Sequence, residues 1–243
     1  DLKIDVLNPC LELNLNKIIP NLEKYDGLIW GGSSLNIYND TPEIKRQISF
    51  MKECFKKIKK MLAICWGMQV AVTAAGGEVK KGSNGSHIGI ANDVELTNDG
   101  LNSLLYKDKS SKFNTPAFNF DEVVTVPNGS VHLAFNKINK IQGLNFKYGA
   151  SEIWGLQYHP EITYEKMVDI IKFRKNALKF KYLALVYCCW CGWSRRLGLG
   201  LDGLVNRTYF DFHFLACVSK SLTNWKRKTQ RFVEPRSNDK KGT

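Results

Sequence analysis

Hydrophobic positions in the first part of the chain fall into short runs separated by amphipathic stretches. The apolar runs at 2–7, 25–30 and 61–65 have the length of strands. After the second run, Thr41 and Pro42 suit the N-cap and first position of a helix. Apolar residues then recur at helical spacing, at Ile44, Ile48, Met51 and Phe55. This alternation predicts a three-layer α/β fold, with a mostly parallel sheet flanked by helices.

The pattern changes after the second predicted helix, which covers 66–75 and ends at the glycine pair Gly76-Gly77. Short β-branched runs then follow, separated by Asn, Gly and Pro, as is typical of strands joined by turns. These runs lie at 94–96, 123–126 and 131–134. A last strand at 153–158 and an amphipathic helix from Tyr164 to about Phe180 complete the predicted domain.

The last quarter of the chain differs in composition from the rest. Residues 1–182 contain 17 isoleucines and residues 183–243 contain none. Six of the 11 basic residues in that last part are arginine, against two of 24 before it. We therefore predict one domain over 1–182. Residues 183–243 are predicted to be an atypical basic tail rich in Cys, Trp and Arg, either disordered or derived from a shifted reading frame.

The net charge of +12 raises the question of a nucleic-acid partner. In the tail, 11 basic and four acidic residues give +7, whereas 24 basic and 19 acidic residues give the first 182 residues only +5. A charge of that size, spread over that length as scattered lysines, is ordinary. Charge is the only support for nucleic-acid binding, so we do not expect it.

Cysteine usage and hydropathy indicate the cellular setting. The seven cysteines are an odd number, and those of the main body, Cys10, Cys54 and Cys65, lie far apart. With no signal-peptide pattern before them, they favour the cytoplasm over a secreted disulfide scaffold. No apolar run reaches the roughly 18–20 residues that span a bilayer, so no membrane partner is expected. The cysteine cluster at 188–191 lacks the two spaced pairs of a zinc site, so no metal is expected.

Cys65 lies between the apolar run at 61–64 and a predicted helix, which is the sequence form of a nucleophile elbow. The tight turn needs small residues two positions before and after the nucleophile, and these are Ala63 and Gly67. The helix N-terminus favours the reactive thiolate, and the N–H of Trp66 can face a developing oxyanion. The alternative is a buried and inert cysteine, which this short pattern by itself favours.

The segment GLQYHPE offers a base for this thiol. His159 ends an apolar strand, Pro160 stops that strand, and Glu161 lies on the same side of an extended segment. A thiol nucleophile needs a base, and the base needs an acid to orient it. The alternative is a surface histidine at a strand end with a glutamate that caps the next helix. The glycine pair Gly31-Gly32 likewise allows close backbone approach to a ligand, or is only a turn.

Taken in order, WGGS, AICWGMQ and GLQYHPE resemble the class I glutamine amidotransferases, the family that includes the glutaminase part of GMP synthase. The number of residues between the cysteine and the His–Glu pair is also similar to that in the family. The resemblance covers residue 1 to about residue 180. It implies a flavodoxin-like fold and a cytoplasmic enzyme that needs no cofactor. It further implies that glutamine is hydrolysed to glutamate, and that the ammonia goes to an acceptor on a separate synthetase subunit.

The resemblance also implies a role for each matching residue. Cys65 would attack the side-chain amide and form a γ-glutamyl thioester. His159 would move the proton to the leaving ammonia, and Glu161 would orient His159. Four further residues are implied to bind the substrate: Gly32 and Trp66 through oxyanion N–H groups, Gln69 one helical turn after the nucleophile, and Asn119.

The chain departs from the family pattern at several positions. The usual glycine two residues before the nucleophile is Ala63, and Ser33 stands where the glycine loop often has proline. Asn119 replaces the histidine of a frequent H-x-D motif, which affects glutamine or partner recognition. The family also begins with a strand and a helix before the segment matching 2–7. The resemblance therefore implies an N-terminally truncated fragment whose sheet lacks an inner strand.

Two other functions remain open from the sequence. A γ-glutamyl hydrolase would use the same triad on a γ-glutamyl amine or peptide, and only substrate profiling separates it from a glutaminase. An inactive regulatory or binding module on the same fold is disfavoured by the presence of Cys65, His159 and Glu161 together.

Overall fold

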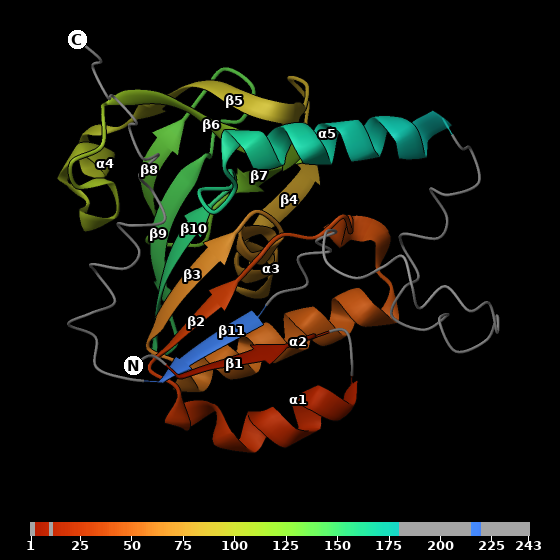
Figure 1. The fold of residues 1–243 in the computed structure, drawn as a ribbon. Helices are drawn as coiled ribbons and strands as arrows, with labels where there is room; N and C mark the ends of the chain where they lie inside the picture. The colour runs from red at the N-terminus through yellow and green to blue at the C-terminus, as the bar shows by residue number, and fades with distance from the viewer. Residues whose placement is uncertain (1–2, 10–11, 180–214, 220–243) are drawn as a thin grey trace, which may run out of the picture.

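The computed structural model describes residues 3–9, 12–179 and 215–219. A nine-stranded sheet forms its centre, with the strands in the order β1-β11-β2-β3-β10-β9-β8-β5-β6, and a separate pair is formed by β4 and β7 (Figure 1). The strands of the large sheet are β1 (Lys3–Leu7), β2 (Gly27–Trp30), β3 (Lys60–Ile64), β5 (His87–Leu96), β6 (Lys112–Asn119), β8 (Val131–Phe135), β9 (Gly143–Tyr148), β10 (Ser151–Leu156) and β11 (Leu215–Ser219). The small pair is β4 (Glu78–Lys81) with β7 (Asp121–Thr125).

The helices connect these strands and cover the sheet. They are α1 (Glu12–Ile18), α2 (Pro42–Lys57), α3 (Trp66–Ala74), α4 (Asn98–Asn102) and α5 (Tyr164–Lys179), with short 3₁₀ turns η1 (Ile19–Lys24), η2 (Ile37–Asn39) and η3 (Leu104–Tyr106). Within the described residues, no helix is long and apolar enough to cross a membrane. The α/β fold predicted from the alternation of strand and helix is confirmed.

The centre of the sheet is parallel and its flanks are antiparallel. β3 pairs in parallel with β2 on one side and with β10 on the other. β10, β9, β8, β5 and β6 then pair antiparallel in succession. Parallel strands end at the same edge of a sheet, so the loops that follow β2, β3 and β10 lie together there.

Alternate residues of β3 point to opposite sides of the sheet, as a strand requires. Met61 and Ala63 belong to the core cluster that the sheet shares with α2 and α3. Leu62 and Ile64 belong to a second cluster on the other side, which includes Tyr106 of η3. Burial on both faces explains why the predicted strand at 61–65 is an unbroken apolar run rather than an alternating one.

Several elements were not predicted from the hydrophobic pattern, among them α1, β4, β6 and β9. β6 contains Pro116, which argues against a strand when only the sequence is read. In the structure β6 is the outermost strand, where a missing backbone N–H does not interrupt the sheet.

β11 lies in the region that the sequence assigns to an atypical tail. It pairs antiparallel with β1 on one side and with β2 on the other. The predicted strand at 153–158 is therefore followed by one more strand of the same sheet. The remaining residues of that region lie outside the described part of the chain, so its origin in a shifted reading frame stays a prediction.

Candidate active site

Cys65 occupies the tight turn between β3 and α3. Its backbone has φ 51° and ψ −106°, a conformation that costs free energy for any residue with a side chain. Its N–H donates to the carbonyl oxygen of Leu156 at 2.6 Å, and its own carbonyl oxygen accepts from the N–H of Gln69 at 3.1 Å. The cysteine is thus held between β10 and the first turn of α3, in the strained geometry predicted for a nucleophile elbow.

Small residues beside Cys65 allow this turn to pack closely. A Cβ atom on Gly67 would lie 2.3 Å from the carbonyl oxygen of Trp30, which is a backbone atom of β2. The N–H of Gly67 also donates to the carbonyl oxygen of Gly31 at 3.1 Å. The elbow is therefore in direct contact with the glycine loop that follows β2.

His159 lies three residues beyond the end of β10, and its side chain is almost fully buried. Its N–H donates to the carbonyl oxygen of Pro116 at 2.8 Å, which fixes the backbone against β6. The ring Nδ1 lies 2.7 Å from Oε1 of Glu161. His159 and Glu161 therefore form the oriented pair expected from the sequence.

The glycine loop, the cysteine and the histidine meet at one point. A Cβ atom on Gly32 would lie 2.8 Å from Cε1 of His159, 3.6 Å from its Nε2 and 3.7 Å from Cβ of Cys65. Only a residue without a side chain fits between these two groups. The structure thus brings Gly32, Cys65 and His159 together, although 94 positions separate the last two in the numbering (159 − 65).

Electrostatic interactions favour the charged form of His159. Burial by itself would lower the pKa of the imidazole, because desolvation disfavours the charged form. The negative charges of Glu161 and Cys65 and their hydrogen bonds to the ring outweigh burial and raise the pKa of His159 to about 10. A protonated imidazole at this position is placed to give its proton to a leaving group.

Phe118 of β6 also reaches the site, and sequence reasoning did not single it out as a site residue. Its carbonyl oxygen lies 3.7 Å from Sγ of Cys65, and its ring centroid lies 6.3 Å from that of His159. Sequence reasoning missed Phe118 because the strand that carries it, β6, contains Pro116 and was therefore not predicted. Phe118 forms an apolar wall next to the histidine and leaves a backbone acceptor facing the thiol.

The first turn of α3 carries two of the predicted substrate-binding residues. Trp66 begins the helix, where the first N–H groups have no partner within the helix. Its indole Nε1 donates to Oε1 of Gln47 at 2.8 Å, so the side chain is tied into the core. Gln69 is 3% exposed, and its Nε2 donates to Oε1 of Gln157 at 3.4 Å.

Asn119 belongs to a buried polar network. Its Nδ2 donates to Oδ1 of Asn139 at 2.9 Å and to the carbonyl oxygen of Asp121 at 3.0 Å. Its Oδ1 lies 3.2 Å from Nδ1 of His87, whose other ring nitrogen lies 3.1 Å from Nδ2 of Asn136. These contacts engage both amide hydrogens and the amide oxygen of Asn119, and its predicted contact with substrate stays a prediction.

The same network reaches the segment that follows the glycine loop. The buried carboxylate of Asp121 accepts from Nδ2 of Asn36 at 2.8 Å and from the hydroxyl of Tyr38 at 3.0 Å. Asn36 and Tyr38 follow Gly32 by a few residues, so the carboxylate ties this segment to β7. Sequence reasoning missed this contact, because the residues involved are about 80 positions apart.

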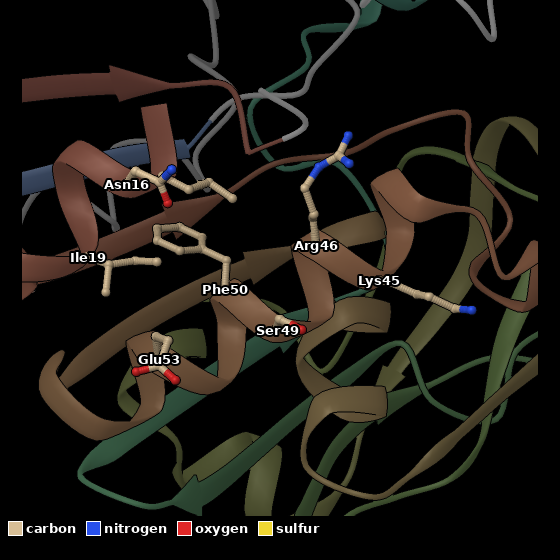
Figure 2. Close-up of a pocket in the computed structure, with 8 residues that line it drawn as sticks. Asn16, Ile19, Lys45, Arg46, Ser49, Phe50 and Glu53 are labelled. Atoms are coloured by element: carbon tan, nitrogen blue, oxygen red, sulfur yellow. The ribbon is translucent and has the colours of Figure 1, made fainter. Parts of the chain in front are cut away.

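The described residues provide no metal-binding cluster, and one cavity among them lies away from Cys65. No group of three or more His, Cys, Asp or Glu among the described residues could hold a metal ion. A cavity of about 320 Å³ lies between α2 and the segment of α1 and η1, where Asn16 and Ile19 lie near the ring of Phe50 (Figure 2). Its lining includes none of the residues around Cys65, so its position does not connect it with the chemistry of the triad.

Comparison with known proteins identifies relatives of this chain. The family model for glutamine amidotransferase class-I matches residues 6–175. Gamma-glutamyl-L-1-hydroxyisopropylamide hydrolase from Pseudomonas sp is 40% identical over 58% of the chain, and the match spans 49% of that protein's length. A glutamine-hydrolyzing GMP synthase subunit from Methanosarcina acetivorans is 32% identical over 63% of the chain and 77% of that protein. In fold, the chain is similar to a glutamine amidotransferase from Thermotoga maritima, with a TM-score of 0.51 and 23% identity over 65% of this chain and 67% of the other.

Proposed function

Because the chain belongs to the class I glutamine amidotransferases, we propose that it hydrolyses the side-chain amide of glutamine with a Cys65–His159–Glu161 triad. The observation that carries this proposal is the meeting of the strained Cys65 elbow with the His159–Glu161 pair beside Gly32. The family match accounts for the fold, and this convergence supports the chemistry in this particular chain.

The reaction proceeds in two steps in this proposal. Sγ of Cys65 attacks the amide carbon, and a C–S bond forms as the C–N bond breaks. His159 gives its proton to the leaving nitrogen, so that ammonia departs and a γ-glutamyl thioester remains. A water molecule then attacks the thioester, His159 accepts the water's proton, and Cys65 leaves as glutamate is released.

Backbone N–H groups support the charge that develops on the amide oxygen. We assign this role to Gly32, which lies against Cys65 and His159, and to Trp66, the residue that follows the nucleophile. Gln69 lies one turn along α3 and is assigned to hold the substrate's amino-acid end. Glu161 keeps the imidazole oriented through its 2.7 Å contact with Nδ1.

A γ-glutamyl hydrolase is the second candidate, and one observation favours it. The relative with 40% identity carries a name that specifies hydrolysis of a γ-glutamyl amide, whereas the GMP synthase relative is 32% identical. The same thioester chemistry would then release an amine instead of ammonia. With glutamine as substrate, the ammonia would pass to a separate synthetase partner, which the similarity to one subunit of a GMP synthase supports.

A cytoplasmic location is part of the same proposal. Cys54 and Cys65 are both buried and neither forms a disulfide, and catalysis requires Cys65 to remain reduced. A reducing compartment meets that requirement.

The test is product release by the purified chain from glutamine and from γ-glutamyl alkylamides. We expect glutamate in the wild type and none above background in Cys65→Ala, because the covalent route is lost. Cys54→Ala is the matched control, since Cys54 is a buried cysteine of α2 that forms no disulfide and lies outside the elbow. Release that survives in Cys65→Ala would disprove the triad, and a folded wild type inactive on both substrates would favour a binding module.

A further inference from the structure

Two buried glutamines lie side by side on neighbouring strand ends, next to the predicted substrate-binding residue Gln69. Gln157 follows the last residue of β10 and Gln142 precedes the first residue of β9. Leu156 pairs with Gly143, and the N–H of Gln157 donates to the carbonyl oxygen of Gln142 at 2.9 Å. Gln157 and Gln142 are therefore direct cross-strand neighbours, with side chains on the same face of the sheet.

That face is the one covered by α3. Leu156 and Tyr158, on either side of Gln157, both belong to the core cluster on the opposite face. Because side chains alternate along an extended segment, Gln157 points toward α3. The 3.4 Å hydrogen bond from Nε2 of Gln69 to Oε1 of Gln157 agrees with this direction.

The amide of Gln142 and the NH₂ group of Gln157 oppose stability rather than support it. Gln142 and Gln157 are both fully buried. Among the described residues, Nε2 of Gln157 and both polar side-chain atoms of Gln142 have no hydrogen-bond partner. Burying an unpartnered amide costs free energy that an apolar side chain of similar volume would not. The amide of Gln157 therefore needs an explanation other than packing.

The bond to Gln69 provides that explanation. It engages the NH₂ group of Gln69, so the carbonyl oxygen of that amide remains to accept a hydrogen bond from an amino or amide group of the substrate. Without an acceptor at position 157, the Gln69 amide is free to rotate and present its donors instead. We propose that Gln157 is a positioning residue, which acts through Gln69 to hold that carbonyl oxygen toward the substrate; this rests on the proposed function.

The test compares Gln157→Leu with Gln142→Leu in the full chain. Gln142→Leu removes an amide with no partner, so it should melt at or above the wild-type temperature. Gln157→Leu removes one unpartnered donor and one hydrogen bond to Gln69, so it should melt close to the wild-type temperature. Gln157→Leu should raise KM for the hydrolysed substrate by about 3- to 10-fold, which corresponds to one lost hydrogen bond. Its kcat should stay within about 2-fold, since the triad is untouched. Gln142→Leu should leave KM unchanged, because Gln142 makes no bond to Gln69.

A second readout is independent of turnover. The side-chain NH₂ protons of Gln69, followed by NMR in ¹⁵N-labelled protein, should be protected from exchange in the wild type and in Gln142→Leu. They should lose that protection in Gln157→Leu.

Three results would overturn the proposal. They are an unchanged KM in Gln157→Leu, an equal rise of KM in Gln142→Leu, and Gln69 protons that do not respond to Gln157→Leu. A folded wild type that hydrolyses neither glutamine nor a γ-glutamyl amide would instead overturn the proposed function, and the positioning role would fall with it.

Discussion

At the scale of a single residue, the pKa of His159 is set by burial and by two neighbouring side chains, which act in opposite directions. Burial lowers its pKa, while Glu161 and Cys65 together raise the pKa to about 10. The raised value means that the folded protein binds a proton that the unfolded chain releases near pH 6.5. The stability this proton contributes is present below about pH 6.5 and is lost as the pH rises through about 10.

Glu161→Gln should therefore have an effect that depends on pH. The variant loses the carboxylate that raises the pKa of His159, so its free energy of unfolding should fall below that of the wild type at pH 6. The deficit should be about 1.4 kcal/mol for each unit by which the pKa falls, and it should close as the pH approaches 10. Denaturant titrations across this range measure it. The turnover number should drop by roughly 10²–10⁴-fold, because the imidazole loses its orientation.

Glu165→Gln is the control for this prediction, since Glu165 is an exposed residue at the start of α5. It should leave both the activity and the pH profile of stability unchanged. A stability deficit of Glu161→Gln that is constant between pH 6 and pH 10 would contradict the proposed ion pair.

At the scale of elements, the site depends on how closely β2, β3 and α3 approach one another. The elbow residue Gly67 lies against the backbone of Trp30 and donates to Gly31. The sequence indicated that a small residue is needed at position 67. It did not indicate which residue packs against that position. Trp30 and Gly67 belong to different elements, and only the parallel pairing of β2 with β3 brings them together.

Gly67→Ala should test this contact. The added Cβ would lie 2.3 Å from a backbone oxygen, which cannot move aside as a flexible side chain can. We expect a loss of about 1–3 kcal/mol in the free energy of unfolding, together with reduced turnover because the elbow shifts. Chemical denaturation with a parallel activity assay measures both effects. Gly76→Ala is not an equivalent control because Gly76 has a positive φ. Ala74→Gly, at the buried last residue of the same helix, serves instead, because it should lower stability without crowding the elbow and should leave the turnover of the folded variant unchanged.

At the scale of the whole molecule, β11 joins a segment from the far end of the chain to the first part of the sheet. Cys217 pairs with Asp5 on β1 and with Leu28 on β2. In this arrangement β11 links β1 to the parallel centre. The sequence predicts that residues after 182 lie outside the domain, whereas this strand pairing places β11 within its sheet. The two descriptions lead to different expectations for substitutions in β11.

Cys217→Pro should distinguish them. Proline lacks the backbone N–H and is excluded from inner strands, so the variant should lose about 1–3 kcal/mol in the free energy of unfolding. Cys217→Val keeps the backbone donor and suits a strand, and it should unfold like the wild type. A proline variant as stable as the wild type would support the prediction that the region lies outside the fold.

The sequence by itself determined the local chemistry and most of the central elements. Strand periodicity, the Thr41-Pro42 helix start and the small residues around Cys65 act within a few positions of one another, so their signals are contained in the pattern. The tertiary structure decided which residues meet. Phe118 beside Cys65, Asp121 beside Tyr38 and Gln157 beside Gln69 are contacts between distant segments. Such contacts depend on strand order and register, which the periodicity of one segment does not specify.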